Sequence, residues 1–152
     1  MSEIRIIGRK DRADFPMFEM FNVPVKIDSG AYSSSIHCSS VSEIKKNENE
    51  SFLEVIFLDE SYAGFKSGKK IFTSYKKKKV KSSTGDEQER FFVRIPIVLF
   101  GEIIESDFSL TTRNGLKSPV LIGRKLLNKK FLIDTSKTNL SFKEKKKIMK
   151  WK

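Results

Sequence analysis

Cysteine is almost absent from this sequence, and Cys38 alone cannot form an internal disulfide. Such usage fits a reducing compartment. No stretch approaches the ~20 apolar residues that a membrane-spanning helix needs. No early apolar run follows basic residues and precedes a small-residue cleavage site. The sequence therefore predicts a soluble, cytoplasmic protein.

Histidine is equally scarce, and His37 stands directly before Cys38. A tetrahedral zinc site draws on three or four His, Cys or carboxylate ligands. Neighbours on a strand point to opposite faces, so these two residues cannot easily share a metal or form a thiolate–imidazole pair. No metal centre is predicted, although a site of His37 with carboxylates, or one across a dimer interface, is left open. No glycine-rich loop ends in Gly-Lys-Ser or Gly-Lys-Thr, so no nucleotide cofactor is predicted either.

Acidic residues are in deficit: 19 Asp and Glu face 30 Lys and Arg, which gives a formal net charge of +11. This balance indicates acidic partners. Much of the excess is in a lysine-rich tail, residues 143–152, which is expected to fray or to form a short amphipathic helix. The tail could contact RNA, ribosomes or an anionic membrane face, or act only as a solubilising extension. We expect a main domain over residues 1–142 and a basic tail over 143–152.

What the chain has in abundance is short β-rich runs. The 152 residues, with 38% apolar content and 13 Phe, suit one domain with a substantial core. Runs with strand character cover residues 4–7, 23–28, 52–58, 91–100 and 103–110. Turn signals separate them, and only residues 124–128 offer a convincing helical turn in the middle of the chain. The sequence predicts an all-β, closed or partly closed barrel with one short helix.

Two motifs carry the chemical information. The apolar alternation Val23, Val25, Ile27 ends in Asp28-Ser29-Gly30-Ala31. About ninety positions later, Leu121-Ile122-Gly123 precedes the helical turn. Taken alone, Asp-Ser-Gly is also a common surface turn, because Asp and Ser cap turns and Gly adopts positive φ.

Together the motifs give a resemblance to aspartic peptidases. The chain resembles a bacterial family of small retropepsin-like proteins that are often labelled ATP-dependent zinc proteases. The likeness covers residues 5 to 142, and further matching segments are Ile7-Gly8-Arg9, Ser33 to His37, Val80 to Gly85, Glu89-Arg90, Thr112-Arg113 and Phe131 to Asp134. This sequence has Ser29 where the family usually has Thr, and Tyr32 where it usually has a basic residue.

The resemblance implies a catalytic loop and a support behind it. Asp28 would be catalytic, Ser29 and Gly30 would shape its loop, and Leu121, Ile122 and Gly123 would buttress it. The mechanism needs two aspartates, one to deprotonate water and one, protonated, to polarise the peptide carbonyl. Asp134-Thr135-Ser136 imitates the motif, but it lacks the glycine and the second apolar-apolar-Gly strand. We therefore expect Asp134 to be a structural turn residue, and a homodimer in which two copies of Asp28 meet.

Substrate-binding positions follow from the same resemblance. A covering hairpin is expected at residues 82–85, between two strands, and it includes Thr84 and Gly85. Arg90 and Arg113 would hold substrate carboxylates, with internal ion pairs as their alternative role. Ala31 completes the set beside the catalytic loop.

The interpretation favoured by these features is an aspartic endopeptidase acting on acidic or glutamate-rich peptides. The family's association with an ATP-grasp ligase that adds glutamates to a ribosomal protein makes such a ligase, or the ribosome, an expected partner. Two alternatives stay open. One is a non-catalytic barrel that binds an acidic peptide or RNA, and the other is a metal-dependent peptidase centred on His37.

Overall fold

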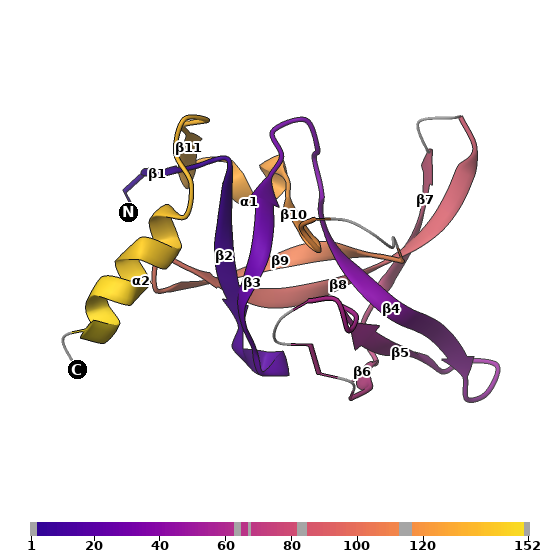
Figure 1. The fold of residues 1–152 in the computed structure, drawn as a ribbon. Helices are drawn as coiled ribbons and strands as arrows, with labels where there is room; N and C mark the ends of the chain where they lie inside the picture. The colour runs from indigo at the N-terminus through magenta and orange to yellow at the C-terminus, as the bar shows by residue number, and fades with distance from the viewer. Residues whose placement is uncertain (1–2, 63–64, 67, 82–84, 113–116, 151–152) are drawn as a thin grey trace.

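The structure is a computed structural model that describes residues 3–62, 65–66, 68–81, 85–112 and 117–150 (Figure 1). Thr84 and Arg113 lie outside the described residues. The strands are β1 (Arg5–Ile7), β2 (Lys10–Phe15), β3 (Met20–Ile27), β4 (Ser34–Lys45), β5 (Ser51–Phe57), β6 (Lys70–Phe72), β7 (Lys76–Lys81), β8 (Glu87–Leu99), β9 (Glu102–Thr111), β10 (Val120–Ile122) and β11 (Phe131–Ile133). The helical elements are the 3-10 helix η1 (Pro16–Phe18), α1 (Arg124–Leu127) and α2 (Leu140–Lys150).

Six strands close into a ring in the order β10, β3, β2, β8, β9, β4. The ring closes because the short strand β10 pairs in parallel with β3 and antiparallel with β4. Its buried side chains form one cluster, in which the Phe15 and Phe108 rings meet edge to face with centroids 6.0 Å apart. The all-β, partly closed barrel expected from the sequence is thereby confirmed.

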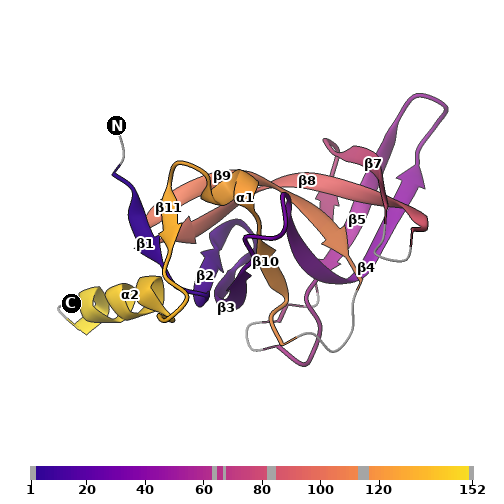
Figure 2. The same cartoon turned by 90° about the horizontal axis from the view of Figure 1, so that it is seen from above.

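Two arms extend from the ring. Strands β5 and β6 continue the sheet beyond β4, and β7 forms a hairpin with β8. At the other end of the molecule lie the two-stranded β1–β11 sheet and helix α2 (Figures 1 and 2). None of the helices in the described part of the chain has the length and apolar character that would let it span a membrane.

The five predicted strand runs overlap β1, β3, β5, β8 and β9, although β3 and β8 begin earlier than predicted, at Met20 and Glu87. Strand β2 was not among the predicted runs, because its sequence is rich in charged residues and one of its inward-facing side chains is a carboxylate. Asp11 is only 2% exposed. Its carboxylate accepts hydrogen bonds from the backbone N–H groups of Ser141 and Phe142, at 2.9 and 3.1 Å. An aspartate that faces inward breaks the apolar alternation from which a strand is inferred.

The same contact explains the state of the tail. Asp11 satisfies N–H groups in the first turn of α2, which a helix leaves without partners of its own. Lys145 then binds the Asp14 carboxylate at 2.7 Å. The tail was expected either to fray or to form a short helix. In the structure its described residues belong to helix α2, which begins at Leu140. The division of the chain at residue 142 stays a prediction.

Candidate active site

Asp28 stands where strand β3 leaves the ring. Alternate residues Val23, Val25 and Ile27 are buried, so the strand enters its loop with the aspartate at its end. The backbone N–H of Asp28 donates to the Ile122 carbonyl at 2.9 Å, which continues the parallel β3–β10 pairing by one residue. The Asp28 side chain is half-buried.

The loop folds back on the Asp28 side chain. Gly30 donates its backbone N–H to Oδ1 of Asp28 at 3.0 Å, and Ala31 donates to the Asp28 carbonyl at 3.2 Å. These are the contacts of a turn in which an aspartate side chain accepts from the backbone two residues on. Within the described part of the chain, Oδ2 of Asp28 takes part in no hydrogen bond. One carboxylate oxygen is therefore fixed by the loop, while the other is available to a water molecule or a second carboxyl group.

Gly123 lets strand β10 pass directly behind this loop. A Cβ atom at this position would lie 2.7 Å from the Ser33 carbonyl group and 2.7 Å from the Tyr32 carbonyl oxygen. The Gly123 N–H donates to the Ser34 hydroxyl at 3.0 Å in a buried setting. Because the neighbouring atoms belong to the backbone, only glycine permits this approach.

Helix α1 holds the loop from its other end. Backbone N–H groups of Arg124 and Lys125 donate to the carbonyls of Ala31 and Tyr32 at 2.8 and 2.9 Å. The Arg124 guanidinium donates to the Ser29 carbonyl at 2.9 Å. Sequence reasoning assigned no role to Ser34 or Arg124. The available signals were a hydroxyl residue just after the loop and a basic residue directly after Leu-Ile-Gly.

An ion pair fastens α1 to the neighbouring strand β9. Lys125 Nζ lies 2.9 Å from Oδ2 of Asp107. This hydrogen bond is the main cause that holds the pKa of Asp107 below its usual range. Asp107 is only 17% exposed, whereas Lys125 is 42% exposed, so the expected contribution to folding is at most about 1 kcal/mol.

We predict a pH-dependent effect of Lys125→Gln. A carboxyl group whose pKa is lower in the folded state stabilises the fold above its unfolded pKa, and this stabilisation is lost as the pH falls through the folded pKa. The melting temperature of Lys125→Gln should therefore lie below that of the wild type at neutral pH, and the two should converge well below about pH 4. Thermal unfolding across this range measures the gap. Lys130→Gln, which removes an exposed lysine with no ion pair among the described residues, is the control. A gap that persists undiminished at low pH would contradict the assignment.

Three of the predicted substrate-binding residues, Ala31, Gly85 and Arg90, lie in the described part of the chain. Gly85 is exposed and has φ of 88° in the connection between β7 and β8, as a tight turn requires. Arg90 is half-buried on β8 opposite Lys78. The β7–β8 hairpin and the β3–β4 loop rise toward the same side of the molecule (Figure 1). The roles of Gly85, Arg90 and Ala31 toward a substrate stay predictions.

The two residues considered for other chemistries are buried in β4. His37 is fully buried, and its Nε2 lies 2.7 Å from the Asp59 carboxylate. Two hydrogen bonds from Ser61, through its hydroxyl and its backbone N–H, are the main causes that lower the pKa of Asp59. Burial raises the pKa of the Cys38 thiol far above its ordinary value, which disfavours the reactive thiolate. Among the described residues, no group of three or more His, Cys, Asp or Glu side chains could hold a metal ion.

Asp134 lies in a turn of its own, which follows β11 of the separate two-stranded sheet. Its Oδ1 accepts hydrogen bonds from both the backbone N–H and the hydroxyl of Ser136, at 3.0 and 2.6 Å. Its backbone N–H donates to the Ile7 carbonyl at 2.9 Å, which continues the β1–β11 pairing. These contacts give Asp134 the geometry of a turn residue between β11 and the segment that leads to α2.

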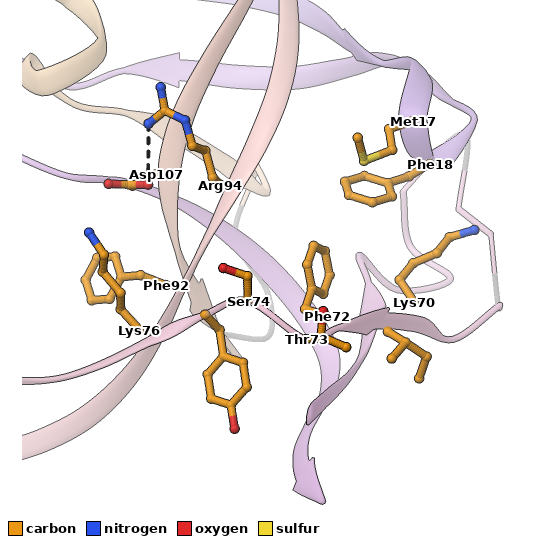
Figure 3. A pocket seen from close by; sticks show the side chains of 12 residues that line it. Met17, Phe18, Lys70, Phe72, Thr73, Ser74, Lys76, Phe92, Arg94 and Asp107 are labelled. Carbon is orange, nitrogen blue, oxygen red and sulfur yellow. Dashed lines mark ion pairs between the residues drawn. The ribbon is translucent and has the colours of Figure 1, made fainter. Parts of the chain in front are cut away.

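A cavity of about 770 Å³ lies between η1, residues 70–76 and strands β8 and β9 (Figure 3). Aromatic side chains of Phe18, Phe72 and Phe92 line it together with three cationic groups, Lys70, Lys76 and Arg94. Asp107 also lines it, and its carboxylate pairs with Arg94 at 3.7 Å. Residues 28–31 are not part of this lining.

A closed β ring that carries an Asp-Ser-Gly loop, with a Leu-Ile-Gly strand passing behind it, defines a domain of the retropepsin-like class. The family model described as "RimB-like: Retropepsin-like aspartic endopeptidase RimB" matches residues 6–144, and the chain belongs to this family.

Similar proteins fall into two groups. Proteins named "Probable alpha-L-glutamate ligase" from Shewanella pealeana and Desulfotalea psychrophila are 28% and 24% identical to this chain, over 88% and 86% of its length. The chain spans only 29% and 28% of those two relatives. The crystal structure of Lpg0085, a Legionella pneumophila protein of unknown function, has a TM-score of 0.70 and 23% identity. That match covers 91% of this chain and 99% of the other, and it supports the fold.

Proposed function

We propose that this protein is an aspartic endopeptidase that hydrolyses acidic, glutamate-rich peptides at a site formed by Asp28 of two subunits. The observation that carries the proposal is the Asp28 loop itself. One Asp28 oxygen accepts from Gly30 at 3.0 Å, and the loop carbonyls of Ser29, Ala31 and Tyr32 are held by residues of α1. Such a fixed, half-buried carboxylate is suited to general acid–base catalysis.

The chemistry requires two carboxyl groups in different protonation states. An ionised Asp28 takes a proton from water as the water oxygen attacks the peptide carbonyl carbon. The protonated Asp28 of the partner subunit donates its proton to the carbonyl oxygen. When the tetrahedral intermediate collapses, the C–N bond breaks and the leaving nitrogen takes the proton that Asp28 accepted from water. A hydroxyl group of the intermediate returns a proton to the partner subunit's Asp28, so that one water is consumed and both carboxyl groups regain their starting states. Asp134 is not proposed for the second role, because it follows β11 in the separate β1–β11 sheet, whereas Asp28 follows β3 of the ring.

The substrate class is supported by charge and by relatives. A net charge of +11 favours encounter with acidic chains. The region that matches this chain also occurs within longer proteins named for glutamate ligation. A glutamate ligase that extends a protein, such as one of the ribosome, would supply the substrate. This ligase is the proposed functional partner, and the cytoplasm is the proposed location.

The dimer is tested by the absolute mass in solution. Light scattering over a concentration series, with and without a glutamate-rich peptide, should give twice the chain mass of 17.5 kDa in at least one of these conditions. Asp28→Asn should associate to the same extent, because the amide keeps the shape of the side chain and its acceptor for the Gly30 N–H. A monomeric mass throughout would remove the second carboxyl group and with it the proposed mechanism.

A further inference from the structure

A band of cations lies on strands β2 and β3 and on the segments that precede β2 and β10. We define it as the basic face, made up of Arg9, Lys10, Arg12, Lys26 and Lys117. They line a groove of about 720 Å³ whose apolar part includes Pro24 and Leu121. Register brings these residues together, because Lys26 stands opposite Lys10 on one side and beside Leu121 on the other.

Among the described residues, no carboxylate pairs with the cations of the basic face, although Arg9 and Arg12 donate to the Thr135 and Asn22 carbonyls at 3.2 and 3.4 Å. Lys10 and Lys26 are exposed and directly opposite each other, an arrangement that destabilises a strand pair. Asp11 lies between Lys10 and Arg12 in sequence, but its carboxylate is turned inward to the first turn of α2. None of the five cations forms an ion pair with another described residue. Lys125 and Lys145, by contrast, form ion pairs with Asp107 and Asp14 that join separate elements of the fold.

The composition of the groove favours a peptide over nucleic acid. Single-stranded nucleic acids are usually held by aromatic side chains that stack on bases, together with cations. Among the described residues that line the groove, none is aromatic. Lys10 and Arg12 are two residues apart on one strand, which places them about 7 Å apart along it. An extended peptide repeats its side chains on one face at the same interval.

We propose that the basic face is a docking surface for an extended, carboxylate-rich segment of a peptide, outside the catalytic loop. Lys26 lies on β3, two residues before Asp28, which directly follows the strand, so one acidic chain can occupy the groove and continue toward the loop. The proposal rests on the proposed function for its substrate class. The basic face would be the part of the surface that selects acidic chains. Its residues would bind substrate carboxylates that are remote from the bond that is cleaved.

The test measures binding separately from cleavage. A fluorescein-labelled oligoglutamate peptide is titrated, by fluorescence anisotropy, with full-length Asp28→Asn and with the same protein carrying Lys10→Gln and Lys26→Gln. The double substitution should raise Kd about tenfold, because two charge contacts are lost. Thermal unfolding without peptide should show equal or higher stability, because the repulsion between the two lysines is removed. This second measurement excludes misfolding as the cause of weaker binding.

The control removes the same charge from another surface. Lys143→Gln with Lys147→Gln takes two exposed lysines, one turn apart, from helix α2. This control should change Kd by less than about twofold. If both double substitutions weakened peptide binding equally, the peptide would be attracted by net charge alone, and the proposal of a docking surface would be overturned. If Lys10→Gln with Lys26→Gln weakened the binding of a single-stranded RNA probe and left peptide binding unchanged, the peptide docking surface would also be overturned, in favour of a nucleic-acid site.

Cleavage assays with otherwise wild-type protein separate this proposal from the proposed function. For a long acidic substrate, Lys10→Gln with Lys26→Gln should raise KM with little change in kcat. If the wild type cleaves acidic peptides and this variant has an unchanged KM and Kd, the docking surface fails while the peptidase stands. If no peptide is cleaved but the groove variant still loses binding, the activity fails while the docking surface stands.

Discussion

Asp28→Asn is expected to abolish peptide cleavage, lowering kcat by about 1,000-fold or more, because the amide can neither accept the proton of the attacking water nor donate one to the carbonyl oxygen. The substitution keeps an oxygen that can accept from Gly30 N–H, so the loop and the melting temperature should be retained. Cleavage of a glutamate-rich peptide, followed by mass spectrometry of the products, measures the effect. Undiminished turnover in Asp28→Asn would remove Asp28 from catalysis.

The matched control is Asp134→Asn. Asp134 also accepts from a residue two positions on, but it lies in the turn after β11. The control variant should keep wild-type kcat. Mixing wild-type and Asp28→Asn chains in equal amounts gives a further criterion, provided that subunits exchange. If both copies of Asp28 are needed in one dimer, activity per total protein falls to about one quarter, whereas independent sites would retain about one half.

Gly123→Ala is expected to have the largest effect on the folded state around the site. The added Cβ would meet the Ser33 and Tyr32 carbonyl groups at 2.7 Å, and backbone atoms cannot move aside as a flexible side chain can. Either β10 or the Asp28 loop must shift. We expect the free energy of unfolding to fall by about 3 kcal/mol, in the upper range for overpacking. Cleavage should be lost even where the chain remains folded, because Asp28 is hydrogen-bonded to this strand.

Chemical denaturation gives the stability change, and cleavage is assayed at low temperature, where circular dichroism shows that the variant is folded. Gly68→Ala is the control because a Cβ at Gly68 meets nothing within 4 Å. It should leave stability within about 0.5 kcal/mol of the wild type. Normal stability and activity in Gly123→Ala would show that the close passage of β10 behind the loop is not required.

The motifs were accessible from sequence because they combine local chemistry with local geometry. Strand alternation up to Ile27, the hydroxyl and glycine after Asp28, and the apolar pair before Gly123 each reflect one segment. Strand β2 was not accessible in the same way. Its inward residue Asp11 is satisfied by N–H groups of α2 about 130 positions away, and no local rule reveals such a partner.

The basic face shows the same division. Each cation can be read from the sequence, and their number predicts an acidic partner. Their gathering on one surface depends on the register of Lys10 opposite Lys26, and on β10 bringing Leu121 alongside. A shift by one residue would turn each side chain to the opposite face of the sheet.

The sequence by itself determined three features: the all-β class, the single Asp-Ser-Gly loop with the Leu-Ile-Gly strand that supports it, and the strong positive charge. These features depend on strand period, turn chemistry and charge, which are properties of neighbouring residues. Only the tertiary structure decided that β10 lies between β3 and β4, that Gly123 binds Ser34 across 89 positions, and that His37 faces Asp59. Pairings over such distances are selected by the packing of the whole ring, where many segments must bury their apolar faces together.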